Sequence, residues 1–410
     1  MVPCGVWDWS DVKQAQSNFY VQQGIKDDGV DSWWLDWCCD GWINHPYAQS
    51  MINAGERGFV TSRAGSSFEA NQPAGQSGWA GKYVTGPWTD QRSAIHFTGD
   101  THGTWSTLAY EAQLTPDEAS VGLPYVSHDI GSFSGPPSDG SGPRTSKDPD
   151  DLYLRWLQMG VFQPIMRLHS TRGGRLPWEY DAPTQRIGDS LMQLRSQLVP
   201  YLYNLAHDTT QAGLPMTRAL YLNYPNSKEA YSFPDEYLLG DDMLVAPVTT
   251  PGTVAKRTMW FPPGTWTDWF TGRSFRGPVR KTLEVPLDRT PVFVRAGGVV
   301  PLAPSNGRAD QVGSAPLTLR VYPGTGKLQP LPRRGARPRL PAWPVRQHYD
   351  QNRIRQPRRP PRQEDTQQQR HHRPRGQLLR RPAVNPIDHR ANDGSDAAYH
   401  AAARRSSSPS

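Results

Sequence analysis

The chain has 410 residues, of which 36% are hydrophobic, and a formal net charge of +7. Its length predicts two or three domains, and its three cysteines, two of them adjacent, exclude a disulfide framework. The sequence contains no apolar run of about 18 residues, the length that a transmembrane helix needs.

The positive charge is confined to the end of the chain. Residues 327–410 contain 19 Lys and Arg against 6 Asp and Glu, so the residues before them carry a net negative charge. This mildly acidic body holds nearly all of the 15 tryptophans. Such a composition argues against a nucleic-acid partner. Aromatic side chains suit the apolar faces of neutral sugars, and core packing is the alternative role for several of them.

The first 215 residues alternate short apolar strands with amphipathic helices. In chain order the pattern predicts helix Val12–Asp27, strand Asp31–Asp36, helix Trp42–Ala54, strand Gly58–Ser62, strand Ala94–Thr98, helix Thr104–Leu114, strand Pro124–Ser127, helix Asp150–Val161, strand Pro164–Leu168 and helix Gln185–Thr210. This alternation indicates parallel strands joined by crossover helices, in either a doubly wound sheet or a (β/α)₈ barrel.

The ends of the strands favour the barrel. No glycine-rich phosphate-binding turn follows the first strand, which argues against a nucleotide-binding doubly wound sheet. Polar residues instead follow the strands: Asp36, Arg63, Asp100, His128 with Asp129, and Arg167 with His169. A barrel has eight strands and collects functional residues at their carboxyl ends. We therefore predict an α/β fold that is the C-terminal part of a TIM barrel, incomplete at its N-terminus.

From about Tyr221 the hydrophobic pattern changes to a period of two, which is typical of an all-β sandwich. The predicted strands are Tyr237–Leu239, Met243–Pro247, Lys256–Phe261, Thr265–Trp269, Thr282–Pro286, Val292–Arg295 and Val299–Leu302, and Ala315–Tyr322 begins a further one. After Gly326 the composition predicts a disordered basic tail. We expect a barrel domain over 1–220, a β-sandwich over 221–304, the start of a distal β-domain over 305–326 and the tail over 327–410.

Two of the predicted strands lead into an aspartate. Trp33-Trp34-Leu35 is followed by Asp36, and His96-Phe97-Thr98-Gly99 is followed by Asp100. Two carboxylates about 5–5.5 Å apart on either side of one sugar are the working parts of a retaining glycosidase. The aromatic neighbours would exclude water, so that a carboxyl pKa can move.

Each candidate also has a structural alternative. Asp100 could be the N-cap of the following helix. Asp31 and Asp40 are rivals of Asp36, but Asp31 lies at the opposite end of the strand and Asp40 lies in the loop beyond it. His128 is as well suited to a structural hydrogen bond as to a sugar contact, and Arg167 could equally be a core salt-bridge arginine.

Seven segments together resemble glycoside hydrolase family 31, the α-glucosidase and α-xylosidase family. They lie between Trp7 and Tyr322 in the family's order: Gly29–Trp37, Thr61–Arg63, Phe97–Asp100, Ser127–Phe133, Arg167–Ser170, Phe261–Trp266 and Pro291–Gly297. The resemblance implies that Asp36 is the nucleophile and Asp100 the acid/base. It also implies that Arg63 holds the sugar and the nucleophile, and that His169 binds sugar hydroxyls.

The resemblance further implies how the pocket is built. Trp34, Phe97 and Phe133 occupy positions that wall the sugar pocket, and Asp129 stands where the family keeps a buried supporting carboxylate. His128 is a further candidate for substrate contact. The sequence departs from the family at Phe97, where a tryptophan is usual.

The resemblance therefore implies a retaining α-glycoside hydrolase that acts on an oligosaccharide or α-glycoside. A transglycosylase on the same scaffold and an inactive carbohydrate-binding fragment are the alternatives. The family's N-terminal sandwich and first three barrel strands are absent from this sequence, so we expect the isolated chain to be poorly soluble or inactive. We expect no cofactor, metal, nucleic acid or membrane partner, and a cytoplasmic location as the default.

Overall fold

The computed structural model describes residues 95–133, 147–171, 174–304 and 316–324, together with 13, 16, 20, 24, 25, 27–30, 32–35 and 60–62. The expected helix Trp42–Ala54 and the tail after Gly326 lie outside these residues, and Val12–Asp27 is described only at scattered helical positions. None of the helices in the described ranges is long and apolar enough to cross a membrane.

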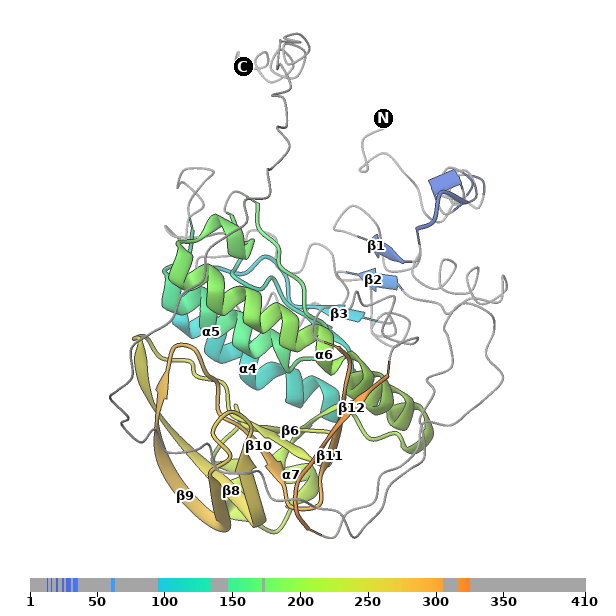
Figure 1. Ribbon diagram of the computed structural model, residues 1–410. Helices are drawn as coiled ribbons and strands as arrows, with labels where there is room; N and C mark the ends of the chain where they lie inside the picture. Colours follow the sequence, from blue (N-terminus) through green and yellow to red (C-terminus); the bar gives the residue numbers. More distant parts are fainter. Residues whose placement is uncertain are drawn as a thin grey trace, which may run out of the picture. The chain divides into compact units, whose positions relative to one another are not determined.

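Four short strands form a parallel sheet in the first part of the chain (Figure 1). β1 (Trp33–Leu35), β2 (Val60–Ser62), β3 (Ile95–Phe97) and β4 (Val126–Ser127) are hydrogen-bonded in that order. All three pairs are parallel, so the carboxyl ends of the strands meet at one edge. A parallel bridge between Ile130 and Leu168 continues the sheet at the point where the sequence predicts the strand Pro164–Leu168.

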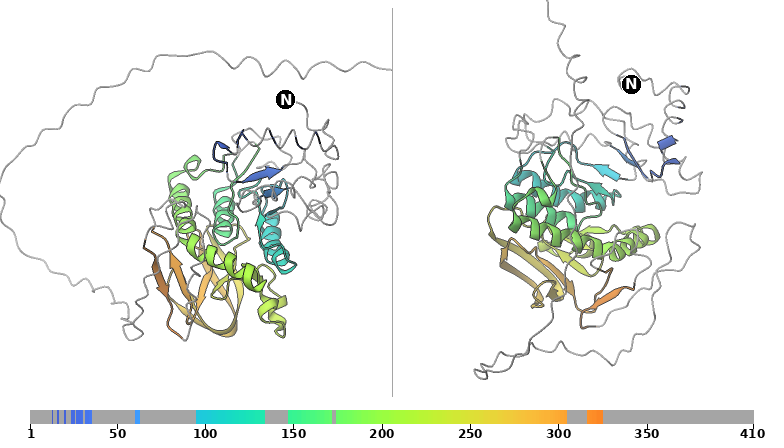
Figure 2. Two further views of the ribbon diagram at one scale, coloured as in Figure 1. Left: turned by 90° about the vertical axis from the view of Figure 1, so that its right-hand side faces the viewer. Right: turned by 45° about the horizontal axis from the view of Figure 1, so that its top comes forward.

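Three long helices lie side by side next to this sheet (Figures 1 and 2). They are α4 (Trp105–Ser120), α5 (Asp150–Val161) and α6 (Ala182–Ala212). Thr104 caps α4 by accepting a hydrogen bond from the Thr107 amide (3.1 Å). Asp181 caps α6 in the same way through the Thr184 amide (3.0 Å). The bounds of α5 are those predicted, whereas α4 and α6 are longer than predicted.

The second part of the chain is an antiparallel sheet with strand order β5-β6-β7-β10-β8-β9. The strands are β5 (Thr217–Ala219), β6 (Tyr237–Leu239), β7 (Met243–Val245), β8 (Val254–Asp268), β9 (Ser274–Pro286) and β10 (Val292–Arg295). β11 (Val299–Leu302) and β12 (Thr318–Val321) form a separate pair. Short helices η4 (Pro177–Glu179), α7 (Leu220–Asn223) and η5 (Lys228–Tyr231) lie in the connections.

Two sequence expectations about this sheet are wrong. The predicted strands Lys256–Phe261 and Thr265–Trp269 are one strand, because β8 continues through an irregularity between Phe261 and Gly264. β5 lies where no strand was predicted; it is only three residues long, and its three side chains are all buried, so it has no alternating pattern.

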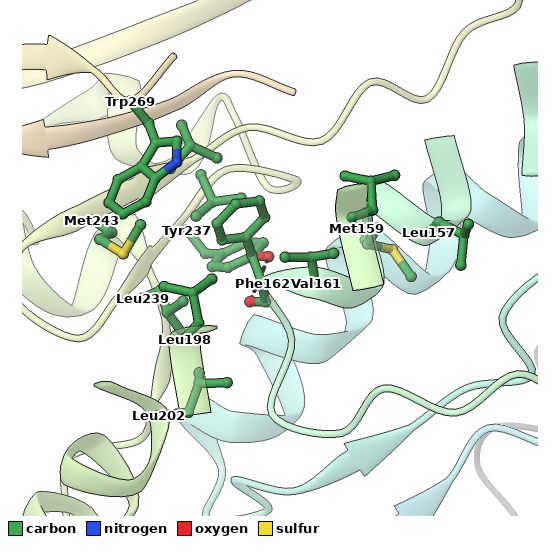
Figure 3. Close-up of a cluster of buried hydrophobic side chains, with 14 of the residues drawn as sticks. Leu157, Met159, Val161, Phe162, Leu198, Leu202, Tyr237, Leu239, Met243 and Trp269 are labelled. Atoms are coloured by element: carbon green, nitrogen blue, oxygen red, sulfur yellow. Dashed lines mark hydrogen bonds between the residues drawn. The ribbon is translucent and has the colours of Figure 1, made fainter. Parts of the chain in front are cut away.

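The hydrophobic core runs without a break from the helices into the antiparallel sheet (Figure 3). Val161 and Phe162, at the end of α5, belong to one buried cluster with side chains from α6, β6 and β7 and with Trp269. Tyr237 of β6 is fully buried and donates its hydroxyl to the Phe162 carbonyl (3.0 Å). The helices and the antiparallel sheet therefore share one core. Burial of each large side chain in it stabilises the fold by about 1.5–3 kcal/mol.

A buried arginine joins α5 to the antiparallel sheet. Arg155 is 1% exposed, and its guanidinium donates to the carbonyls of Val285 (2.8 Å), Pro286 (3.3 Å) and Arg289 (2.7 Å). Burial lowers the pKa of Arg155 to about 10, which leaves it protonated at neutral pH. Val285 and Pro286 end β9 and Arg289 follows it, and a buried carbonyl without a donor is costly.

A second arginine, which is half-buried, fixes the segment that precedes the Ile130–Leu168 bridge of the parallel sheet. Arg195 of α6 donates to the carbonyls of Val161 (3.0 Å), Gln163 and Pro164 (2.8 Å). The last carbonyls of a helix have no partner within the helix, and a cation is favourable beside them. Arg195 therefore closes the end of α5 and sets where residues 165–169 begin.

We predict that Arg155→Met lowers the free energy of unfolding by about 3–5 kcal/mol, because the Val285 and Arg289 carbonyls lose their charge-assisted hydrogen bonds from the guanidinium. Arg276→Met, which removes an exposed arginine from β9, is the matched control and should stay within about 0.5 kcal/mol of the parent chain. Urea denaturation followed by circular dichroism measures both values. Equal stabilities of the two variants would contradict the role of Arg155.

Candidate active site

Asp100 lies just beyond the carboxyl end of β3. The strand ends at Phe97, Thr98 continues the pairing through its amide to the Ser127 carbonyl (3.1 Å), and Gly99 has a positive φ of 90°. Asp100 is half-buried. Its alternative role as an N-cap is wrong, because Thr104 caps α4.

Asp36 and Arg63 lie outside the described residues. β1 ends at Leu35 and β2 at Ser62, and these two residues are partners in the parallel register. Each predicted site residue thus follows in sequence the last described residue of its strand. Their roles as nucleophile and sugar ligand stay predictions.

Two predicted pocket walls meet across β2. The rings of Trp34 on β1 and Phe97 on β3 lie edge to face, with centroids 4.8 Å apart and an interplanar angle of 83°. Trp34 is 40% exposed, whereas Phe97 is buried. Aromatic pairs prefer this edge-to-face arrangement. The contact places the ends of β1 and β3 around one aromatic surface.

Arg167 packs against both rings, and its guanidinium is also bonded to Ser127 and Asp129. Its guanidinium carbon lies 5.3 Å from the Trp34 ring centroid and 4.9 Å from the Phe97 centroid. The same guanidinium donates to the Ser127 hydroxyl (3.1 Å) and forms an ion pair with Asp129, whose side chain is fully buried. The structure thus confirms the salt-bridge alternative for Arg167 and places its charge beside two predicted pocket residues.

Phe133 and His169 also lie together. Their ring centroids are 5.5 Å apart, and the Phe133 carbonyl accepts a hydrogen bond from the Thr171 amide (2.9 Å). His169 is exposed and Phe133 is half-buried. The structure therefore brings together two further residues that the sequence assigned to the sugar pocket.

The turn before Phe133 depends on a glycine and an arginine. Gly131 has φ +84°, and a Cβ there would lie 2.5 Å from Arg175 Cδ, so only glycine fits. Ser132 is also left-handed, with φ +69°. Arg175 holds Ser132 by donating from Nε to its carbonyl (3.1 Å) and from Nη2 to its hydroxyl (3.2 Å).

The same turn contacts a carboxyl group, that of Asp148, whose pKa is displaced. The Ser132 hydroxyl donates to Asp148 Oδ1 (3.2 Å), and Arg175 Nε lies 3.8 Å from Asp148 Oδ2. Burial raises the pKa of Asp148 to about 7, and the neighbouring arginine and hydroxyl offset only part of this shift. The sequence did not mark Asp148 or Arg175, because their partners lie 16 and 43 residues away along the chain.

His128 faces the interior rather than the sugar pocket. Its Nδ1 lies 3.0 Å from the Thr98 hydroxyl and its Nε2 lies 2.7 Å from the Thr115 hydroxyl. Burial, followed by the charge of Arg167, lowers the pKa of His128 to about 3. With both ring nitrogens engaged by hydroxyls, the geometry favours the structural alternative and removes His128 from the proposed sugar contacts.

Glu111 of α4 completes this interior cluster and was not marked by the sequence. It is fully buried, accepts a hydrogen bond from Trp156 Nε1 (2.7 Å) and lies 3.7 Å from His128 Nδ1. Burial raises the pKa of Glu111 well above its usual range. A single carboxylate on an amphipathic helix carries no sequence signal that distinguishes this buried position from an exposed one.

The described residues include no group of three or more His, Cys, Asp or Glu side chains placed to hold a metal ion. The groups that do meet at the strand ends are aromatic rings, one guanidinium and carboxyl groups. Such a set suits a neutral, hydroxyl-rich ligand and proton transfer.

Two family models together match most of the chain up to residue 300. The glycosyl hydrolases family 31 TIM-barrel domain matches residues 3–205, and the family's C-terminal domain matches residues 213–300. The chain belongs to glycosyl hydrolase family 31. The matches confirm the predicted fold class, in which part of a TIM barrel is followed by a β domain.

Known proteins of family 31 resemble the chain over part of their length. An alpha-xylosidase of Saccharolobus solfataricus is 32% identical over 234 residues, covering 57% of this chain and 31% of the relative. Alpha-glucosidase 2 of Bacillus thermoamyloliquefaciens is 29% identical over 238 residues, covering 58% and 29%. The chain thus spans less than a third of the length of these relatives.

A solved structure shows the same fold. The family 31 dextranase of Flavobacterium johnsoniae, complexed with glucose, superposes with a TM-score of 0.63 at 23% identity. The superposition covers 77% of this chain and 40% of the dextranase. This similarity supports the family 31 architecture of the described residues.

We predict that Asp148 makes the stability of the fold fall as the pH rises from about 4 to 7. Because the folded-state pKa is raised, the unfolded chain releases the Asp148 proton first, and the stability contributed by the protonated form is lost towards pH 7. Asp148→Asn should remove this part of the pH dependence, whereas Asp288→Asn, which removes an exposed carboxylate, should keep it. Unfolding free energies measured at several pH values test this; parallel curves for parent and Asp148→Asn would contradict it.

Proposed function

We infer that this family 31 chain carries the catalytic pair of a retaining α-glycoside hydrolase, which releases terminal α-linked sugars through a covalent glycosyl-enzyme. The observation that supports it most is the contact between Trp34 and Phe97. These residues stand two and three positions before Asp36 and Asp100. The contact therefore draws together the two strands that Asp36 and Asp100 follow in sequence.

The proposed reaction has two steps. Asp36 attacks the anomeric carbon while Asp100 gives its proton to the leaving oxygen, which breaks the glycosidic bond and forms the glycosyl-enzyme. Asp100, now a carboxylate, takes a proton from water as the water oxygen attacks the same carbon and releases Asp36. Two inversions return the sugar in its α configuration.

Other residues would bind and shape the sugar. Arg63 would keep Asp36 ionised, since a nearby cation favours the charged form of a carboxyl group. His169, which is exposed beside Phe133, would hydrogen-bond sugar hydroxyls. Trp34 and Phe97 would cover an apolar face of the ring.

The relatives support an α-linked glucose or xylose as the substrate, since their names include an alpha-xylosidase and an alpha-glucosidase. These two sugars differ at the C6 hydroxymethyl group. The phenylalanine at position 97, which is smaller than the family's usual tryptophan, would leave more room in the pocket.

Covalent trapping tests the proposed nucleophile without a need for turnover. Although we expect the isolated chain to turn over substrate poorly, labelling needs only the first step of the reaction. We predict that 5-fluoro-α-glucosyl fluoride or its xylosyl counterpart adds one fluorosugar to the folded fraction of the 410-residue chain, on the peptide that contains Asp36. Fluoride leaves readily, and the ring fluorine disfavours the oxocarbenium-like transition state, so the intermediate accumulates. Intact-mass and peptide mass spectrometry measure the adduct.

The variants make the assignment specific. Asp36→Asn should abolish labelling, whereas Asp31→Asn, which removes the rival aspartate at the other end of the strand, should be labelled like the parent. Labelling that persists in Asp36→Asn, or that maps to another peptide, would contradict the proposed function. Circular dichroism of each variant verifies that the fold is retained.

A further inference from the structure

Arg167 receives contacts from three strand ends of the parallel sheet at once. Its guanidinium lies over the rings of Trp34 on β1 and Phe97 on β3. Its edge is bonded to Ser127 of β4 and to Asp129 directly after β4. Its backbone carbonyl accepts from the Ile130 amide (3.1 Å), so main chain and side chain both tie residue 167 to its neighbours.

The two sides of the guanidinium differ in burial. Asp129 is fully buried, whereas the Arg167 side chain is 29% exposed and Trp34 is 40% exposed. The ion pair and the Ser127 bond therefore fix the guanidinium from the interior. Phe97 is itself 2% exposed, so of the two aromatic contacts it is the one with Trp34 that lies on the more open side, where the proposed function places the sugar.

We propose that Arg167 is a positioning residue that fixes Trp34 and Phe97 as one rigid wall of the sugar pocket, between the strand ends that carry Asp36 and Asp100. This proposal rests on the proposed function. Contacts of a cation with an aromatic face at these distances contribute attraction to each ring. Because one group serves both rings, loss of the guanidinium frees both walls together.

The guanidinium shape is essential to this role. A planar fork can bond Asp129 and Ser127 in its plane while its face lies on an aromatic ring. A lysine at this position would keep the positive charge for Asp129 but would lose the planar face and the second bond. Arg167→Lys therefore separates the charge from the positioning.

The test compares Arg167→Lys and Arg167→Met with a matched control. Arg273→Met removes a guanidinium that lies 4.9 Å from the Phe275 centroid, the same kind of contact on the antiparallel sheet. The first measurement is ¹⁹F NMR of the full chain labelled with 5-fluorotryptophan, with the Trp34 resonance identified by its loss in Trp34→Phe. We expect this resonance to move in both Arg167 variants and to stay in place in Arg273→Met.

The second measurement is the rate of labelling by the glycosyl fluoride as its concentration is varied. We expect Arg167→Lys to raise the half-saturating concentration roughly tenfold, the size expected from a cation–π contact of this kind, with a maximal rate close to that of the parent. A merely structural role would instead reduce the labelled fraction without moving the half-saturating concentration.

The outcomes separate this proposal from the proposed function. A parent chain that is folded but never labelled contradicts the proposed function, and the Trp34 resonance then decides the positioning role alone. An unmoved Trp34 resonance in Arg167→Lys, or an unchanged half-saturating concentration in a labelled chain, overturns the proposal. Should Arg167→Met fail to fold, Arg167→Lys supplies both measurements.

Discussion

A charged group that is taken out of water needs a partner, and the ion pair of Asp129 with Arg167 meets this requirement at the mouth of the parallel sheet. Asp129 is fully buried, so its carboxylate dictates where a cation must lie. The rings of Trp34 and Phe97 then pack against the Arg167 guanidinium that pairs with this carboxylate. The aromatic side of the candidate site depends on this electrostatic constraint, because moving the arginine would break its ion pair with a buried carboxylate.

Arginine side chains also join other segments of the described fold, by donating to backbone carbonyls. Arg195 of α6 closes the end of α5, and thereby sets the start of the segment that carries Arg167 and His169. Arg155 of α5 donates to the Val285 carbonyl at the end of β9 and to the Arg289 carbonyl just beyond it. Arg175 holds the left-handed turn before Phe133. A guanidinium has five donors in a fixed plane and can therefore replace several missing backbone bonds at once.

The sequence predicted the elements whose local pattern agrees with their surroundings. α5, β6, β10 and β11 have the predicted bounds, because apolar periodicity and burial coincide there. The sequence could not predict that β8 passes through Pro262–Gly264 as one strand, since proline and glycine ordinarily mark a turn, whereas here the pairing with the next strand, β9, continues past them. The two hydroxyls that engage His128 likewise come from Thr98 and Thr115, on different elements. Polar residues at the ends of the predicted strands indicated where Asp100 and His169 lie. Whether a neighbouring polar residue such as His128 is buried depends on tertiary packing, which the local sequence does not show.

The proposed retaining mechanism depends most directly on the distance between the carboxyl groups of Asp36 and Asp100. A crystal structure of the full chain that resolves both residues would measure this distance. The mechanism predicts a separation of about 5–5.5 Å across the pocket walled by Trp34 and Phe97. A separation of about 6.5 Å or more, or an Asp36 side chain that faces away from this pocket, would contradict it.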